Sequence, residues 1–326
     1  MAAGISQNRR ILKWVVMTMS PVLLLHVFAI WCFAAQAPLS SSGEDPDAFR
    51  LSVNVDLVVL QATVRDHLGH TVKGLTQQDF AVFEDGAPQR IRLFRHEDTP
   101  VTVGLVIDHS GSMREKLAEV TAGAQAFVHS SNPNDQMFVV NFNETVSLGL
   151  PVGVRFSDSA EQLGSSIWGS PAIGTTALYD AIIQALNRLQ QGTSEKKVLI
   201  VISDGGDNAS KASLERVLKL TEQSSAVIYT IGIFDALDPD KNPKVLRRLA
   251  QESGGEAFFP IHLNETVEIC ERIARDIRNQ YTIGYSSANP KQDGSYHKVR
   301  ITTQAQDKGK LSVRTRAGYS AQVGTK

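Results

Sequence analysis

Three short polar segments contain the side chains with which this chain could bind a metal ion. Asp108, Ser110 and Ser112 form an Asp-x-Ser-x-Ser pattern directly after an apolar run. Thr176 and Asp204 occur in two later segments, Gly-Thr-Thr and Ser-Asp-Gly-Gly. All five side chains offer oxygen atoms, which Mg²⁺, Mn²⁺ and Ca²⁺ prefer, whereas zinc favours nitrogen and sulfur. We therefore predict that the five hold one divalent cation, Mg²⁺ first, with Mn²⁺ or Ca²⁺ as alternatives.

The apolar runs before and between these segments predict the elements that position them. Nearly continuous apolar strands alternate with helix-period segments, and the strands cover residues 101–107, 137–140, 198–202, 227–231 and 257–259. This alternation predicts an α/β fold with a doubly wound, mostly parallel sheet that is covered on both faces. Loops at the carboxyl ends of such strands line the crevice where ligands bind. The three polar segments are therefore expected to meet there.

Both ends of the chain show a different, strand-like period of two. Apolar and polar residues alternate over residues 49–97 and again from residue 281 to the end. Each segment is marginal as a separate unit, since a few strands alone bury little surface. We expect these two β-strand units to pack together as one antiparallel, sandwich-like domain. It flanks an α/β domain over residues 98–280.

The first 48 residues are typical of an export signal and a linker. Arg9, Arg10 and Lys13 precede an uncharged apolar run over residues 14–35, and the small residues Ala35 and Ala37 follow. We interpret residues 1–37 as a signal peptide and residues 38–48 as a linker. An uncleaved membrane anchor is the alternative, because the run approaches the ~20 residues that span a bilayer. Either interpretation places the protein outside the cytoplasm: periplasmic, in the cell envelope, or secreted. Membrane contact is expected only through an uncleaved segment.

Charge and cysteine content exclude some classes of partner. Without residues 1–37 the chain keeps 34 acidic and 30 basic side chains, a balance of −4. This leaves no basic surplus for phosphates, so no nucleic-acid partner is expected. Only Cys270 remains, which rules out an intrachain disulfide and a thiolate zinc site in the mature chain.

The five predicted ligands also carry a family resemblance. Asp108, Ser110, Ser112, Thr176 and Asp204 resemble, position by position, the metal-ion-dependent adhesion site of von Willebrand factor type A domains. More narrowly, residues 50–320 look like exported bacterial proteins of this kind, on the segments Gly74–Thr76, Phe83–Gly86, Thr176–Ala181 and Tyr281–Tyr285. The resemblance implies a non-catalytic protein-binding module. An acidic side chain of the partner protein would be the last metal ligand.

Several simpler interpretations stay open. Ser112 with Glu115 has the spacing of a helix capping box, Thr176 could cap a helix, and Asp204-Gly205 could be a plain turn. The family more often has a glycine where Thr175 stands, so Thr175 competes with Thr176 as the ligand. His109 is predicted to face solvent or the binding face. Asp180 and Asp207 are predicted to lie around the ligands and to orient them or their waters, with an exposed helix acid as the alternative for Asp180. His67 and His70 are predicted to lie in a hairpin turn.

Two rival functions and one motion complete the predictions. A metal-dependent hydrolase or phosphotransferase would use the same cation, with His109 as the only histidine beside the ligands. An envelope component with a vestigial site is the other rival. The last helix of the α/β domain, around residues 264–280, runs directly into the strand at Tyr281. We hypothesise that partner binding shifts this helix and tilts the flanking β domain.

Overall fold

The structure of the protein is a computed structural model that describes residues 57–234, 239–288, 294–305 and 308–321. The predicted signal peptide and linker lie outside these residues, as does the start of the strand-like segment expected over residues 49–97. The described residues belong to one compact unit. Within the part of the chain that is described, no helix is long and apolar enough to cross a membrane.

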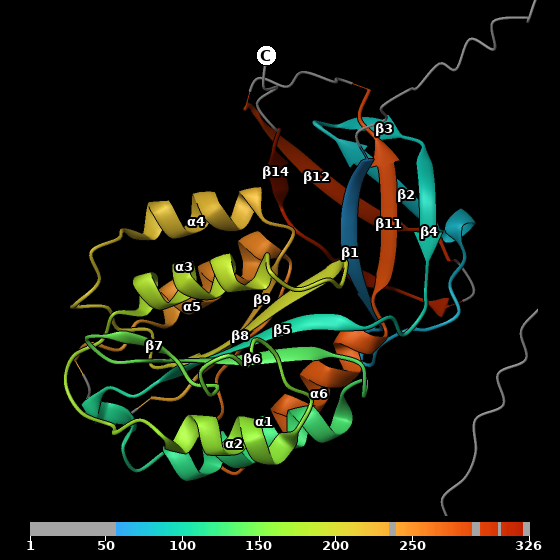
Figure 1. The fold of residues 1–326 in the computed structure, drawn as a ribbon. Helices are drawn as coiled ribbons and strands as arrows, with labels where there is room; N and C mark the ends of the chain where they lie inside the picture. The colour runs from blue at the N-terminus through green and yellow to red at the C-terminus, as the bar shows by residue number, and fades with distance from the viewer. Residues whose placement is uncertain (1–56, 235–238, 289–293, 306–307, 322–326) are drawn as a thin grey trace, which may run out of the picture. The chain divides into compact units, whose positions relative to one another are not determined.

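A six-stranded sheet forms the centre of this unit (Figure 1). All neighbouring strands run parallel except β7, which pairs antiparallel with β6 at one edge. The predicted α/β class with a mostly parallel sheet is confirmed. In spatial order the strands are β10 (Ala257–Phe258), β9 (Val227–Gly232), β8 (Lys196–Ser203), β5 (Val101–Asp108), β6 (Gln136–Phe142) and β7 (Val146–Leu148).

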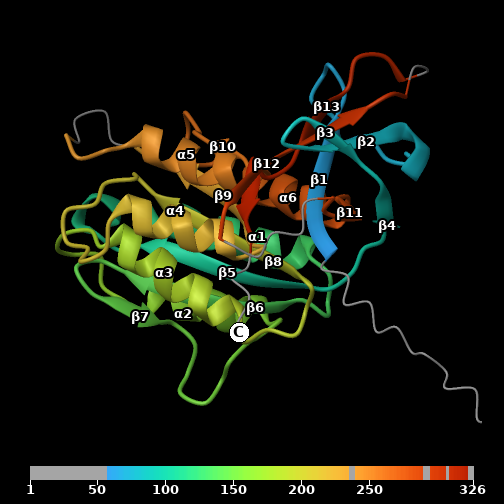
Figure 2. The same cartoon turned by 90° about the horizontal axis from the view of Figure 1, so that it is seen from above.

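Helices cover both faces of this sheet. On one face lie α1 (Leu117–Ser130), α2 (Ala160–Trp168) and α6 (Glu265–Arg278); on the other lie α3 (Leu178–Leu189), α4 (Leu214–Gln223) and α5 (Pro243–Ser253), as Figures 1 and 2 show. Every residue of the central strand β5 is buried, so the helices cover its side chains on both faces of the sheet. The sequence pattern did not predict α2. Its short stretch contains Gly164, Ser165 and Ser166, which weaken the apolar period.

Two four-stranded antiparallel sheets flank the α/β part, and each takes strands from both ends of the chain. The first has the order β13 (Ser312–Arg314), β1 (Leu57–Arg65), β11 (Tyr281–Ser286), β4 (Ile91–Arg95). The second has the order β14 (Gly318–Ser320), β12 (Tyr296–Thr303), β2 (Phe80–Glu84), β3 (Ala87–Gln89). Leu60 pairs with Ile283 and Val82 with Ile301, and all four side chains belong to one buried cluster. The predicted β domain built from both chain ends is therefore present.

Helix α6 is tied to the flanking strands by a group of charged side chains. Asp276 on α6 accepts hydrogen bonds from Arg65 on β1 and, at 3.0 Å, from the Thr71 hydroxyl. Arg314 on β13 pairs with Asp276 at 3.6 Å and with Glu256, and Arg65 also contacts Glu256 at 2.8 Å. The last helix of the α/β part is thus held by ion pairs as well as by the chain connection to β11.

Candidate metal centre

The loop after β5 carries three of the predicted ligands. Asp108 is the last residue of β5 and is 0% exposed. Its Oδ1 accepts a hydrogen bond of 2.8 Å from the Ser110 amide, which turns the chain sharply after the strand. Ser112 follows in a short 3₁₀ turn, and the Ser110 and Ser112 hydroxyl oxygens lie 3.1 Å apart. Three oxygen-bearing side chains are thereby gathered within five residues.

The loop after β8 brings Asp204 to the same place. Strands β5 and β8 are parallel neighbours, so their carboxyl ends lie side by side. The Ser112 hydroxyl donates a hydrogen bond of 2.6 Å to Asp204 Oδ2, across 92 positions in the chain. The Ser203 hydroxyl donates one of 2.6 Å to Asp108 Oδ2. Four predicted ligands thus belong to a single hydrogen-bonded group.

The loop that carries Thr176 is attached to this group through its backbone. The Gly174 carbonyl accepts a hydrogen bond of 3.2 Å from the Gly111 amide in the first loop. Thr176 donates its amide hydrogen to Asn208 Oδ1 at 2.8 Å and accepts the Asn208 amide at 3.0 Å. Thr176 therefore lies between the first loop and the loop after Asp204.

The electrostatics of the site favour an added cation. Burial and the neighbouring charge of Asp204 raise the pKa of Asp108 to about 6, although hydrogen bonds from Ser203 and Ser110 oppose this rise. Among the described residues, the groups bonded to the Asp108 carboxylate are all neutral donors, a hydroxyl and an amide. A buried carboxylate beside a second one is costly unless positive charge compensates it. The carboxylate and hydroxyl oxygens fit a hard divalent cation.

The capping interpretations of Ser112 and Thr176 do not match the local structure. Ser112 does not cap α1, which begins at Leu117 with Lys116 at its N-cap position. Thr176 does not cap α3, whose N-cap is Ala177. Both Ser112 and Thr176 instead make bonds that connect separate loops. Asp204 is followed by a turn, with Gly205 at φ +82°, but its carboxylate also bonds to Ser112.

The expectation that His109 faces solvent or the binding face is wrong. His109 is 1% exposed, and its Nε2 lies 3.2 Å from Asn141 Oδ1. The cause lies in the backbone, because the His109 amide bonds to the Phe142 carbonyl at 2.6 Å and directs the ring into the protein beside β6. Burial lowers the pKa of His109.

The outer ring contains residues that sequence reasoning placed only in part. Asp207 accepts the Tyr179 amide at 2.8 Å, and Asp180 accepts the amides of Lys211 and Ala212 at 2.9 and 3.0 Å. The hydrogen bonds of these two acids thus connect the start of α3 to the loop after β8. Sequence reasoning missed Ser203 and Asn208. A polar residue at the end of an apolar strand was the only signal for Ser203.

His67 and His70 lie in the turn that follows β1, outside the group of predicted ligands. Both side chains are exposed, and His70 Nδ1 lies 3.3 Å from Asp66. Asp66 also accepts the amides of Leu68 and His70, which closes the turn.

Comparisons with known proteins identify the family of the α/β part. The family model for the von Willebrand factor type A domain matches residues 102–270, more than half of the chain. No curated protein matches the sequence. A solved von Willebrand factor type A structure from Catenulispora acidiphila is similar, at 16% identity and TM-score 0.51, over 75% of this chain and 74% of that one.

Two further solved structures show weaker similarity. The vWF domain of the type V pili tip protein Mfa5 from Porphyromonas gingivalis matches at 15% identity and TM-score 0.47, over 55% of this chain and 95% of that one. Proximal thread matrix protein 1 from the mussel byssus, with a zinc-occupied MIDAS motif, matches at 17% identity and TM-score 0.47, over 60% of this chain and 49% of that one.

Proposed function

Because this chain belongs to the von Willebrand factor type A domain family, we propose that it is a non-catalytic protein-binding module that depends on a divalent cation. Asp108, Ser110, Ser112, Thr176 and Asp204 would hold the ion, with Mg²⁺ first and Mn²⁺ or Ca²⁺ as alternatives. An acidic side chain of a partner protein would complete its coordination. The ion supplies the positive charge that two neighbouring carboxylates and an incoming third one require.

The hydrogen bond between Ser112 and Asp204 carries this proposal. It joins two loops 92 residues apart at 2.6 Å, and the Ser110 hydroxyl lies 3.1 Å from Ser112. Hydroxyl and carboxylate oxygens that already bond to one another need only small movements to share a cation. Ser112 is exposed, so the site opens to solvent where a partner could reach it.

The position of His109 favours binding over catalysis. In the hydrolase or phosphotransferase alternative, this histidine is the only one that the sequence places beside the ligands. Its ring is buried against Asn141, and a general base must lie within hydrogen-bond reach of the reacting group. A His109→Ala variant that loses a measurable hydrolytic activity would restore the enzymatic alternative.

We further propose that the protein acts outside the cytoplasm, in the periplasm, the envelope or the medium. The apolar N-terminal segment supports this proposal, with cleavage after residue 37 or retention as an anchor. We also propose domain limits of 49–97, 98–280 and 281–326. Mass spectrometry of the protein from an envelope fraction tests the cleavage, and limited proteolysis tests the limits.

Calorimetric titration with Mg²⁺ tests the metal site directly. The whole chain is expected to bind one ion, and Asp108→Ala should abolish the binding. Asp158→Ala is the matched control, because this acid is exposed and lies outside the site. Equal Mg²⁺ affinity of wild type and Asp108→Ala contradicts the proposal, as does full retention of partner binding in EDTA.

A further inference from the structure

Two sequence segments that resemble the bacterial relatives, but have no place in the metal centre above, meet in the flanking β domain. One contains Glu84 and Asp85 at the end of β2, and the other contains Tyr285 on β11. The Tyr285 hydroxyl donates a hydrogen bond of 2.6 Å to Glu84 Oε2. Residues 201 positions apart thus converge on one buried carboxylate.

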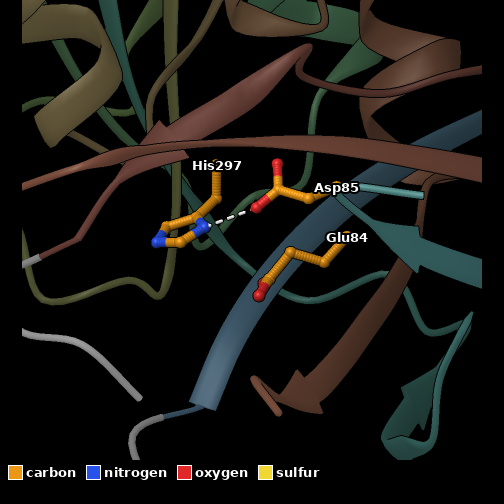
Figure 3. A group of neighbouring side chains, drawn as sticks. All are labelled: Glu84, Asp85 and His297. Atoms are coloured by element: carbon orange, nitrogen blue, oxygen red, sulfur yellow. Dashed lines mark hydrogen bonds and ion pairs between the residues drawn. The ribbon is translucent and has the colours of Figure 1, made fainter. Parts of the chain in front are cut away.

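His297 on β12 completes this group, which Figure 3 shows. One ligand atom from each of Glu84, Asp85 and His297 lies within 4.8 Å of the others. His297 Nδ1 lies 2.8 Å from Asp85 Oδ2. Glu84 and His297 are buried, at 3% and 4% exposure, whereas the Asp85 side chain is half exposed. An ion from solvent could therefore enter past Asp85.

Neighbouring groups hold the atoms of His297 and Asp85 that face away from each other. His297 Nε2 lies 3.1 Å from the Ser295 hydroxyl, and Asp85 Oδ1 accepts the Lys298 amide at 2.9 Å. The remaining atoms, His297 Nδ1 and Asp85 Oδ2, point at each other. In metal sites, a ligating histidine or carboxylate is held in the same way, by a hydrogen bond to the atom that does not face the ion.

Glu84 is held by three neutral donors. Tyr285 and, at 2.9 Å, Tyr319 donate to its Oε2, and the Ser287 hydroxyl donates to its Oε1. Burial raises the pKa of Tyr319 to about 12 and that of Tyr285 further, so both hydroxyls keep their protons. These three bonds leave lone-pair capacity on the carboxylate. Among the described residues, no lysine or arginine forms an ion pair with Glu84 or Asp85.

We propose that Glu84, Asp85 and His297 form a second metal site, for a divalent transition ion of the Zn²⁺ type. One imidazole nitrogen and two carboxylates suit Zn²⁺, whereas the all-oxygen centre at the carboxyl ends of β5 and β8 suits Mg²⁺. The ion binds the lone pair of His297 Nδ1 in the tautomer that carries the ring proton on Nε2, where this proton faces the Ser295 hydroxyl. The fourth position is left for water. The site joins the end of β2 to β12 and shares no residue with the centre around Asp108.

Calorimetric titration of the whole chain with Zn²⁺, in excess Mg²⁺, tests this site. His297→Asn keeps a donor near Asp85 but removes the imidazole ligand, and Asp85→Asn suits the left-handed backbone at this position, φ 49°. Each variant should weaken Zn²⁺ binding by at least ~10-fold. Circular dichroism establishes that both variants fold.

Two control variants identify where the ion binds. His70→Asn tests for adventitious binding at the exposed histidine turn, and Asp108→Ala tests for binding at the centre around Asp108. Neither should change Zn²⁺ affinity. The proposal is overturned if the wild type binds no Zn²⁺, if His297→Asn binds like the wild type, or if a control variant removes the binding. If the protein binds Zn²⁺ but not Mg²⁺, this result contradicts only the function proposed for the centre around Asp108.

Discussion

Asp276 on α6 and Asp108 at the end of β5 are both buried carboxylates, 1% and 0% exposed, but they have different neighbours. Asp276 contacts the guanidinium groups of Arg65 and Arg314, and Glu256 nearby also pairs with both. Asp108 bonds to a hydroxyl and an amide and lies close enough to Asp204 for their charges to repel.

The two regions show how one residue type can serve two purposes. The cluster around Asp276 contains its own positive charges, so it can hold α6 against β1 and β13 without any external ion. The centre around Asp108 contains none that bonds to that carboxylate among the described residues, so its charge must be met from outside. A shift of α6 on partner binding, which the sequence led us to hypothesise, would have to break the ion pairs of Asp276.

The largest expected effect concerns the self-contained cluster. Asp276→Asn removes the charge that faces two partly buried arginines, which should lower the free energy of unfolding by about 3 kcal/mol. Urea denaturation measures this loss. Glu271→Gln on the same helix is the control, because its pair with Arg275 at 3.6 Å is exposed and contributes about 0.5 kcal/mol or less. Equal losses in both variants would remove the distinction between the two regions.

The next effect concerns the cation-dependent centre. With Mg²⁺ at about 100 times its dissociation constant, the wild type should gain about 2.7 kcal/mol of stability over the protein in EDTA. Asp108→Asn should lose this gain, because one of the two carboxylates that hold the ion is gone. In EDTA the variant should be as stable as the wild type within about 1 kcal/mol, since the substitution removes a costly buried charge. Thermal unfolding with Mg²⁺ and with EDTA measures both differences.

A marked loss of stability for Asp108→Asn in EDTA would mean that the carboxylate is satisfied within the chain, as Asp276 is. The comparison would then fail at its centre, whatever the response to Mg²⁺.

A smaller effect is expected at Ser112, which links the two halves of the centre. Ser112→Ala removes one hydroxyl ligand and its bond to Asp204, so Mg²⁺ affinity should fall by about 10-fold, or about 1.4 kcal/mol. Calorimetry measures this change. Ser131→Ala is the control, because that hydroxyl bonds to the Phe127 carbonyl beyond the end of α1. An unchanged affinity in Ser112→Ala would restrict the centre to its carboxylates.

Much of the fold could be predicted because long apolar strands leave a strong signal. The strands that end at Asp108 and Ser203 are buried on both faces, so they read as continuous apolar runs. Helix α5 also leaves a signal in the sequence, because Pro243 stands at its start and Gly254 at its end, where φ is +85°. Helix α2 was missed, since nine residues with a glycine and two serines leave too little of the helical period.

The candidate site shows where sequence patterns stop being informative. Loops at the ends of parallel strands meet in any such sheet, so Asp108 and Asp204 could be placed together before the structure was known. The direction of a single ring depends on local backbone bonds, and for this reason His109 was placed wrongly. Asn208 and Ser203 act through bonds to other loops, which no periodic pattern records. The identity of the five ligands stays a prediction.

The smallest effect concerns the choice between two adjacent threonines. Thr175 is exposed, whereas Thr176 is buried and its backbone bonds to Asn208. Thr176→Val keeps the shape of the side chain but removes the hydroxyl, so Mg²⁺ affinity should fall by up to ~10-fold, whereas Thr175→Val should leave it unchanged. The reverse result would assign the ligand to Thr175. Because both variants keep the carboxylates, neither should alter stability in EDTA by more than about 1 kcal/mol. A loss of stability in EDTA with Thr176→Val would instead mean that its hydroxyl serves the fold, as Thr71 does beside Asp276.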